Sequence, residues 1–294
     1  MESISKATNK SEIISANASY LALDSLTDLS RKCSKALGRD YGENEHYTWN
    51  RSFDYQNWYS RINIKSANAV KGEEAAKLAG ELKALCTETD SPKFLTLSIE
   101  DVSEDFETAL LTAGFKLLKE QKGMLFDVLE SISRPAINAD CSSANKHHIS
   151  IELINAESDE KNIEQFAYIG ERAFGNGGKL EAFKIFAKED NCKFYMITAE
   201  DGVPAATALL NVFESVVEHD GVKYSIKNGG IHEVATLPEY RNRGYATALI
   251  ERIISDAEEM QLDILSLQAS VFGEPVYKRI GFDIVSHIKN YSVG

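Results

Sequence analysis

A short basic turn with one glycine is the part of this sequence best suited to bind a phosphorylated ligand. Residues 241–246 read Arg-Asn-Arg-Gly-Tyr-Ala. Where such a turn opens a helix, the first backbone N–H groups lack partners within the helix and carry partial positive charge, so they stabilise an anion. Gly244 has no Cβ, which lets the backbone close on a diphosphate, and Arg241 and Arg243 add charge. Taken alone, the hexamer is more typical of an ordinary solvated helix start.

The segments on either side place this turn between a strand and a helix. Residues 231–237 are apolar and favour a strand. Apolar residues then recur at helical spacing from Ala246 to Ala257, which predicts a helix ending near Met260. We therefore expect the turn and the start of the helix to bind a diphosphate through Arg241, Asn242, Arg243, Gly244, Tyr245, Ala246 and Thr247.

Three matches in the right order connect this region to a known family. The run from Val234 to Ala246 resembles the cofactor-binding signature of the GNAT N-acetyltransferase superfamily. Residues 265–270 (Leu-Ser-Leu-Gln-Ala-Ser) and 276–282 (Val-Tyr-Lys-Arg-Ile-Gly-Phe) look like its next strand and its tyrosine-bearing helix. The resemblance implies acetyl-CoA as co-substrate. It also implies an α/β (α+β) fold with a central mixed β-sheet flanked by helices.

The same resemblance implies roles for residues beside the turn. The backbone of Val234, Ala235 and Thr236 is expected to pair with the pantetheine arm of the cofactor. An amide there, of Val234 or Ala235, would also meet the oxyanion that develops on the thioester. Ser270 ends a strand that should splay from the cofactor strand. It either contacts the pantetheine or thioester or keeps a solvated hydroxyl.

Tyr277 is the predicted general acid. Its hydroxyl has an ordinary pKa near ~10, so it is protonated at neutral pH and able to donate to a thiolate. Four residues separate Tyr277 from Gly281, as in the family pattern. The alternative is a tyrosine ring that only packs on a neighbouring strand.

Glu233 and His232 are the candidates for a general base. Both lie on the predicted cofactor strand, where alternation would send one side chain to each face. Histidine has a suitable unperturbed pKa of ~6.5, whereas the pKa of a glutamate would have to be raised by burial. The alternative is that one of the two is an ordinary hydrogen-bonded strand residue and the other faces solvent. Some enzymes of this kind need no dedicated base, so its absence would not argue against activity.

Composition limits the class of protein. With 294 residues, 43% of them hydrophobic and 26% charged, the chain is that of a soluble globular protein long enough for two domains. A net charge of −13 argues against a general nucleic-acid partner; it attracts cationic ligands such as amines, or serves solubility alone. No segment is apolar enough to cross a membrane. The four scattered cysteines suggest neither a metal cage nor disulfides. These features favour a cytoplasmic protein without a metal, and they leave the oligomeric state open.

The first half of the chain repeats, more weakly, the order of predicted elements in the second half. A predicted strand (94–98) and helix (106–113) lead to Gly114-Phe115, as the tyrosine helix leads to Gly281-Phe282. Leu110 falls where Tyr277 stands, and no Arg-x-x-Gly-x-Ala is present. The first half resembles the degenerate amino-terminal domain of tandem GNAT proteins, or is an unrelated α/β cap. We expect a flexible N-terminus (1–10), a degenerate GNAT-like domain without the CoA motif (11–130), a linker (131–148) and a catalytic GNAT domain (149–294).

Other elements follow from periodicity. We expect strands at 58–65, 116–128, 150–154, 193–199, 204–213 and 282–291, and helices at 72–87, 160–174 and 179–189. Turn residues at 219–221 and 228–230 predict a turn-rich excursion, or a small extra hairpin, at 218–230. An aromatic cluster in the first half is expected to pack in the core or to form a wall for the substrate: Trp49, Tyr55, Trp58 and Tyr59.

The predicted function is transfer of an acetyl group from acetyl-CoA to an amine, most readily on a small molecule, by direct attack with Tyr277 as acid. Two alternatives remain at this point. One is a non-catalytic, regulatory CoA-binding module, against which Tyr277 argues. The other is an acetyltransferase acting on protein lysines or N-termini. An open groove over the sheet would favour the protein substrate, and a closed pocket between the halves would favour the small amine.

Overall fold

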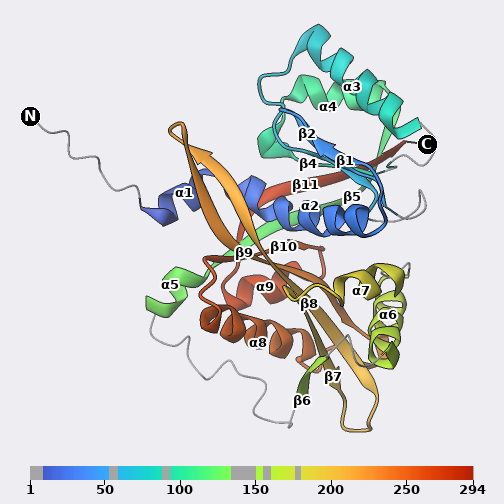
Figure 1. Ribbon diagram of the computed structural model, residues 1–294, viewed down its shortest axis with the longest axis vertical. Helices are drawn as coiled ribbons and strands as arrows, with labels where there is room; N and C mark the ends of the chain where they lie inside the picture. Colours follow the sequence, from blue (N-terminus) through green and yellow to red (C-terminus); the bar gives the residue numbers. More distant parts are fainter. Residues whose placement is uncertain are drawn as a thin grey trace, which may run out of the picture.

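The structure is a computed structural model that describes residues 9–52, 59–87, 92, 94–133, 150–154, 160–175 and 180–293. The strands of these residues form one mixed sheet in the order β1-β2-β3-β4-β11-β5-β10-β9-β8-β7-β6. Figure 1 shows the helices on both sides of this sheet. A mixed sheet flanked by helices is the fold class expected from the sequence.

Each half of the chain contributes one run of elements. The N-terminal half contains α1 (Lys10–Ala16), α2 (Ala18–Ala36), β1 (Tyr41–Glu43), β2 (Tyr47–Asn50), β3 (Arg61–Ile64), α3 (Gly72–Thr87), β4 (Phe94–Ser98), α4 (Glu104–Thr112), β5 (Phe115–Asp127) and α5 (Val128–Ser133). The C-terminal half contains β6 (Ser150–Ile154), α6 (Glu160–Phe174), α7 (Leu180–Phe186), β7 (Cys192–Thr198), β8 (Pro204–His219), β9 (Val222–Thr236), α8 (Tyr245–Glu259), β10 (Ile264–Ala269), α9 (Glu274–Ile280) and β11 (Asp283–Val293).

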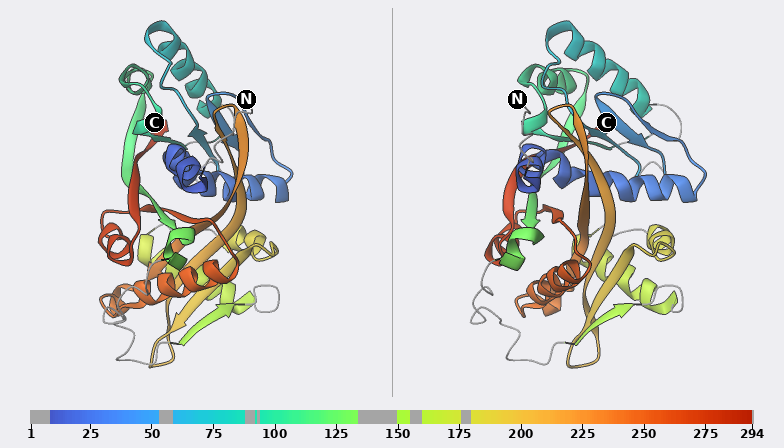
Figure 2. Two further views of the ribbon diagram at one scale, coloured as in Figure 1. Left: turned by 90° about the vertical axis from the view of Figure 1, so that its left-hand side faces the viewer. Right: turned by 60° about the vertical axis from the view of Figure 1, so that its left-hand side comes forward.

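The two halves exchange strands. β5 pairs antiparallel with β10, and β11 pairs antiparallel with both β4 and β5. The last strand of each half therefore lies against strands of the other half. As a result, the two halves share a continuous sheet in place of two separate ones (Figures 1 and 2).

Helix α2 joins the halves across one face of this sheet, and we did not predict it. It contacts β5, β8, β9, β10 and β11 and runs through the middle of the molecule in Figure 1. Leu21, Leu26 and Leu29 are buried there, but so are four serines and threonines (Ser25, Thr27, Ser30 and Ser34). These polar residues on the buried face obscure the apolar period from which a helix is normally predicted.

Four hydrophobic clusters hold the helices on the sheet, one of which packs α1 and the start of α2 on its central strands. α8 and α9 pack on one face of the C-terminal half, α2, α6 and α7 pack on the other face, and α3 and α4 pack on the N-terminal half. The buried face of α8 is typical: Leu249, Ile250 and Ile253 are fully buried, and each such side chain contributes ~1.5–3 kcal/mol relative to an exposed one.

The segment 218–230 belongs to a hairpin, as one of its two interpretations predicted, but the hairpin is longer than expected and no separate excursion forms. β8 and β9 form one long hairpin that turns at Asp220 and Gly221, both with positive φ, as a two-residue hairpin turn requires. Gly229 and Gly230, which suggested a turn, lie inside β9. A Cβ on Gly230 would approach the Cβ of Ser25 in α2 to 2.3 Å, so this glycine allows the helix to lie close to the strand.

Other elements agree closely with expectation. α3, β4 and α6 have the predicted bounds, while α7 is shorter and β8 longer than predicted. Residues 131–133 of the expected linker form the end of α5; the rest of the linker and residues 1–8 lie outside the described residues, as do Tyr55 and Trp58. Trp49 and Tyr59 pack in different clusters. No helix of the described residues is both long and apolar enough to cross a bilayer.

Candidate functional site

The basic turn lies between β9 and α8, as predicted. A 3-10 helix at 238–240 follows β9, and α8 begins directly after Gly244. Asn242 and Gly244 have φ values of 62° and 82°. Gly244 is the N-cap and offers no side-chain acceptor. Within the described part of the chain, the N–H groups of residues 243–247 donate to no acceptor, so they are free to bind an anion.

The two arginines brace this turn. Arg241 donates from Nη2 to the carbonyl oxygen of Ala173, at the end of α6, over 3.2 Å. Arg243 donates to the carbonyl oxygen of Glu239 over 3.2 Å and lies over the ring of Tyr240, 4.8 Å from its centroid. Both guanidinium groups are held against the scaffold beside the turn. They add positive potential there, while the main-chain amides are the groups left to contact a diphosphate.

The first residues of α8 differ in what they can offer a ligand. The side chain of Tyr245 is in the core, with 8% of the residue exposed, so its main chain alone can contact a ligand. Ala246 and Thr247 are half-buried. The small side chains at these two positions leave the helix mouth open.

β9 and β10 part just before the turn. They are paired in parallel only where Ile264, Leu265 and Ser266 face residues 228–230. The rest of β10 pairs with β5 on its other side. From residue 231 onward, no described residue pairs with the edge of β9 that faces β10. We call residues 231–236 the unpaired edge of β9; this is the divergence that the family resemblance implied.

A β-bulge interrupts β9 on the unpaired edge. Its pairing with β8 passes from His232 directly to Ala235, so two residues, Glu233 and Val234, oppose a single residue of β8. Glu233 has a φ of 50°, a conformation that is uncommon outside glycine. The bulge changes the direction of the side chains and amides at this point.

The amide directions beyond the bulge can be derived from one hydrogen bond. Leu237 donates its N–H to the carbonyl oxygen of Ala205 in β8, over 2.9 Å. Successive amides of a strand point to opposite edges, so the N–H groups of Val234 and Thr236 are directed away from β8, toward the unpaired edge. The N–H of Ala235 is directed toward β8.

Tyr277 lies in α9 with its ring in the same cluster as the start of α8. The residue is 8% exposed and its ring meets that of Phe282 edge-on, with centroids 5.8 Å apart. Burial raises the pKa of Tyr277 above its ordinary value, so the hydroxyl stays protonated through the neutral range. No hydrogen bond of this hydroxyl to a described residue is seen, and burial alone accounts for its raised pKa, which leaves it available to a ligand.

Glu233 is half-buried and faces the N-terminal half. The Tyr59 hydroxyl donates to its Oε1 over 3.3 Å, while Oε2 is buried without a partner among the described residues. Burial raises the pKa of Glu233 to about 7, against the lowering effects of the Tyr59 hydrogen bond and the Lys119 charge. A carboxylate with a pKa near neutrality can accept a proton at neutral pH.

His232 does not face the opposite side from Glu233, so the expected alternation was wrong. The ring of His232 lies beside Ser25 of α2, and Glu233 contacts Tyr59, which packs in the same cluster as α2. The bulge is the reason, because it turns Glu233 toward the face that His232 already occupies. Burial, together with the Lys32 charge, lowers the pKa of His232 to about 3. It is therefore neutral and a weaker base than Glu233.

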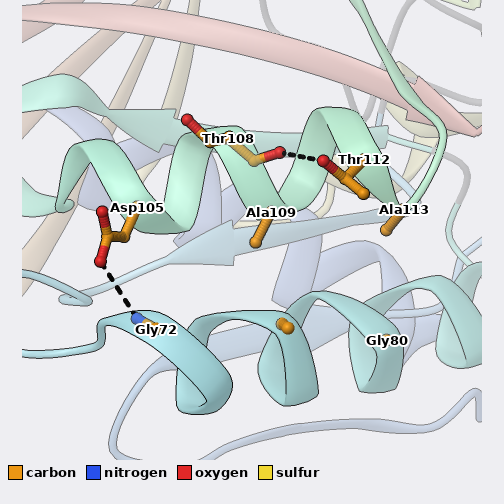
Figure 3. Close-up of a pocket in the computed structure, with 8 residues that line it drawn as sticks. Gly72, Gly80, Asp105, Thr108, Ala109, Thr112 and Ala113 are labelled. Atoms are coloured by element: carbon orange, nitrogen blue, oxygen red, sulfur yellow. Dashed lines mark hydrogen bonds between the residues drawn. The ribbon is translucent and has the colours of Figure 1, made fainter.

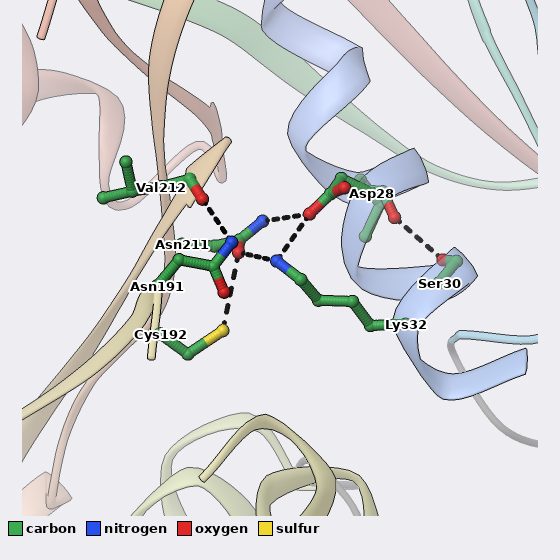
Figure 4. A network of polar contacts seen from close by, with 8 residues as sticks. Asp28, Ser30, Lys32, Asn191, Cys192, Asn211 and Val212 are labelled. Atoms are coloured by element: carbon green, nitrogen blue, oxygen red, sulfur yellow. Dashed lines mark hydrogen bonds and ion pairs between the residues drawn. The ribbon is translucent and has the colours of Figure 1, made fainter. Parts of the chain in front are cut away.

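A polar network fixes α2 beside these residues. Lys32 forms an ion pair with Asp28 over 2.7 Å and also donates to Asn211 of β8. The Asn211 side chain donates in turn to Asp28 over 2.9 Å. Figure 4 shows this network spanning from α2 to β8. It places the cationic Lys32 where it acts on His232.

Ser270 forms the turn that leads into α9. Its Oγ accepts from the N–H of Gly273 over 3.2 Å, and its carbonyl oxygen accepts from the N–H of Glu274 over 2.9 Å. The residue is exposed. The structure thus gives Ser270 a role in the turn that leads into α9.

The matching region of the N-terminal half is closed by hydrogen bonds. β3 and β4 also pair in parallel over three residues, 61–63 with 94–96. Beyond them, however, Ala67 donates to the carbonyl oxygen of Asp101 over 2.7 Å, and Ser103 donates to that of Ala67 over 3.3 Å. Ala67 and Val102 form a parallel bridge. The edge of β3 is thereby paired again.

The start of α3 in that half is also occupied. The N–H of Gly72 donates to Oδ2 of Asp105 in α4 over 3.1 Å, as Figure 3 shows. Glu73 and Glu74 stand in the first turn of α3. Between the two helices lies an open groove of about 480 Å³ lined mostly by small side chains. A carboxylate of the protein thus sits at the helix start, where an external anion would have to bind.

Comparisons with known proteins bear on the family and the fold of this chain. Residues 159–282 match the model of the acetyltransferase (GNAT) family. No curated protein matches the sequence. Structural similarity to solved proteins is extensive but occurs at low sequence identity, so it bears on the fold alone.

Three solved structures illustrate the similarity. A GCN5-related N-acetyltransferase from Kribbella flavida has a TM-score of 0.60 at 14% identity, over 92% of this chain and 95% of that one. A functionally unknown conserved protein from Staphylococcus epidermidis gives 0.58 at 13%, over 90% and 99%. A glucosamine N-acetyltransferase region of a fungal multi-domain β-N-acetylglucosaminidase gives 0.59 at 11%, over 96% and 37%. The first and the third, both described as N-acetyltransferases, cover both halves of this chain, so the GNAT fold extends over nearly its whole length.

Proposed function

We propose that the protein transfers an acetyl group from acetyl-CoA to the amine of a small molecule, because residues 159–282 match the model of the GNAT acetyltransferase family and the site described above suits this chemistry. The observation that carries the proposal is the set of unpaired amides at residues 243–247, which open next to the unpaired edge of β9. The amides suit a diphosphate, and the edge suits an extended amide-containing arm that pairs as a strand does.

The residues divide the chemistry among them. The turn holds the diphosphate, and the amide of Val234 is directed toward the unpaired edge, where it can stabilise the oxyanion of a thioester under attack. An amide aimed at a developing charge typically contributes ~2.7–4 kcal/mol. The Tyr277 hydroxyl then supplies the proton to the leaving thiolate. Because burial holds the pKa of Tyr277 above its ordinary value, this proton is present at neutral pH.

Glu233 is the base in this proposal. The amine must lose a proton before or during attack, and a carboxylate whose pKa is about 7 takes it up most effectively near neutral pH. His232 is too weak a base for this role because its pKa is about 3.

The surroundings of Glu233 favour a small acceptor over a protein segment. Tyr59 and α2, both from the N-terminal half, lie against the bulge of β9. Oε2 of Glu233 and Nε2 of His232 are buried. Among the described residues, this cover from the N-terminal half encloses the carboxylate of Glu233, and an enclosed base supports a small amine more than a protein segment.

A thiol-release assay with acetyl-CoA across a panel of primary amines tests the proposal. We expect acetyl-dependent release with at least one small amine and none with lysine-containing peptides. Release with peptides alone would exclude the small acceptor. No release with any acceptor, together with tight acetyl-CoA binding, would support the regulatory module in its place.

The role of Glu233 has its own signature in the pH dependence. Because only the ionised form accepts a proton, kcat/KM should rise with pH up to about 7 and then level off. Glu233→Gln should lower kcat/KM by ~10²-fold or more and remove this rise. His232→Gln is the control and should keep it. A Glu233→Gln enzyme with the wild-type profile would exclude Glu233 as the base.

A further inference from the structure

Tyr59, a residue of the N-terminal half, contacts the proposed base. Its hydroxyl donates to Oε1 of Glu233 over 3.3 Å, although 174 residues separate the two in sequence. Tyr59 is 2% exposed. Its ring meets Phe186 of α7 edge-on, with centroids 5.2 Å apart. The ring is thus fixed by packing, and the hydroxyl is presented to the carboxylate from a rigid position.

Charged and titratable groups surround Glu233 on several elements. The positive charge of Lys119, on β5, lowers the pKa of Glu233. Arg61 of β3 acts on Tyr59 and Lys119. Within β9, His232 is the neighbouring residue, and α2 presents Lys32 and Asp28 to His232. Tyr59 is the member of this set that donates a hydrogen bond to the carboxylate in the structure.

We propose that Tyr59 is a positioning residue, which orients the Glu233 carboxylate and keeps it in its ionised, proton-accepting form. The inference rests on the proposed role of Glu233 as the base. A phenol that donates to a carboxylate favours the charged form, because the hydrogen bond is stronger to the ion than to the neutral acid. The N-terminal half, which lacks a cofactor turn of its own, thereby completes the catalytic site of the other half.

The variant Tyr59→Phe removes the hydroxyl and keeps the ring with its contact to Phe186. Tyr291→Phe is the matched control: Tyr291 is also buried, and its hydroxyl donates to Glu107 over 2.6 Å. Both variants lose one phenol-to-carboxylate hydrogen bond in a buried setting. Only Tyr59→Phe loses it at Glu233.

The direct measurement is a carbon-13 NMR titration of the full chain labelled at the glutamate carboxyl carbons. The Glu233 signal is assigned by its absence in Glu233→Gln. In Tyr59→Phe the pKa of Glu233 should rise by roughly 0.5–1 unit, because the favourable hydrogen bond to the ion is lost. In Tyr291→Phe it should stay at the wild-type value. An unchanged pKa of Glu233 in Tyr59→Phe overturns the inference. The measurement needs neither a known acceptor nor an active enzyme.

Kinetics adds the functional readout. With the amine acceptor that turns over fastest, the acidic limb of kcat/KM in Tyr59→Phe should move to higher pH by the same shift, and kcat should fall ~3–10-fold below pH 7 with little change in KM. A shift seen equally in Tyr291→Phe would mean a general structural effect and would overturn the inference. A wild-type profile in Glu233→Gln would instead overturn the proposed base, so the two failures are distinguishable.

Discussion

The two halves of this molecule share a skeleton and differ at the point where a cofactor would bind. Each half contains two parallel strands that pair over three residues, β3 with β4 and β9 with β10. A crossover helix, α3 or α8, connects the two strands along the chain. Each half then continues through a short helix to a left-handed glycine, Gly114 with φ of 99° or Gly281 with φ of 115°. A phenylalanine follows each glycine, and a strand that pairs with the other half comes next.

The differences are concentrated at the helix start. A glycine of positive φ stands at the start of both helices: Gly72, with φ of 54°, is the first residue of α3, and Gly244, with φ of 82°, is the N-cap of α8. The mouth of α3 is capped by Asp105 of the protein itself, whereas the amides at the mouth of α8 have no acceptor among the described residues. At the position of Tyr277 the N-terminal half has Leu110, which is fully buried.

Segment length explains how one skeleton supports both outcomes. From the last paired residue of the first strand to the helix glycine there are nine residues in the N-terminal half (Asn63 to Gly72) and fourteen in the C-terminal half (Gly230 to Gly244). In the shorter segment, Ala67 pairs with residues 101 and 103 through backbone hydrogen bonds. The longer one has room for the bulge at Glu233 and for the basic turn. We infer that this extra length, more than the helix itself, makes a cofactor site.

The substitution with the largest expected effect places a carboxylate at the open helix mouth. Gly244→Glu should lower the affinity for acetyl-CoA by at least ~100-fold, or about 2.7 kcal/mol. The new carboxylate repels the diphosphate at the helix start, and the positive φ at this position is strained for any residue other than glycine. Calorimetry measures the affinity and the stoichiometry, for which we expect one equivalent per chain.

Gly72→Glu is the matched control for that experiment. It makes the same change at a helix glycine of positive φ in the other half, where Asp105 already occupies the mouth. We expect it to destabilise the fold to a similar degree and to leave acetyl-CoA affinity within about twofold of wild type. Equal losses of affinity in both variants would contradict the difference between the halves.

The next largest effect should come from removal of the acid. Tyr277→Phe should lower kcat by ~10²-fold or more and leave acetyl-CoA affinity unchanged, because the hydroxyl acts only when the thiolate leaves. Tyr195→Phe, which removes a hydroxyl that donates to Asp256 over 2.7 Å in the same half, should change stability without this loss. A wild-type kcat in Tyr277→Phe would mean that Tyr277, like Leu110 in the N-terminal half, only packs in the core and is not the general acid.

The smallest effect is expected where the N-terminal half is opened. Asp105→Ala removes the acceptor of the Gly72 amide and should lower the free energy of unfolding by ~1 kcal/mol, as for loss of a helix cap. Glu104→Ala, at the neighbouring exposed carboxylate, should cost less than ~0.5 kcal/mol. Chemical denaturation gives both values. Binding of a second acetyl-CoA by Asp105→Ala would show that Asp105 alone blocks cofactor binding in the N-terminal half. The renewed strand pairing at Ala67 would then not be what prevents it.

Local patterns in the sequence predict much of this comparison. The helix period of α8, the glycine turn and the two Gly-Phe junctions are all encoded within short stretches, so the fold class and the basic turn could be inferred. Tyr277 follows from its spacing to Gly281. These features depend on neighbours in the chain and on the resemblance that they carry.

Features that depend on distant contacts could not be inferred. The strand exchange of β5 and β11 is a choice of partners, which no local pattern records. The side to which Glu233 points depends on a bulge, and strand alternation predicts the opposite. The Tyr59–Glu233 contact joins two residues whose types are ordinary by themselves. α2 was missed because polar residues such as Ser25 and Thr27 lie on its buried face.

An amide-resolved NMR titration of the deuterated, nitrogen-15-labelled chain with acetyl-CoA tests the central claim most directly. The account predicts that the amide signals of residues 243–247 shift together with that of Val234 and saturate at one equivalent, while those of residues 72–75 stay in place. Shifts at residues 72–75, or unperturbed signals at residues 243–247 in the presence of bound acetyl-CoA, would contradict it.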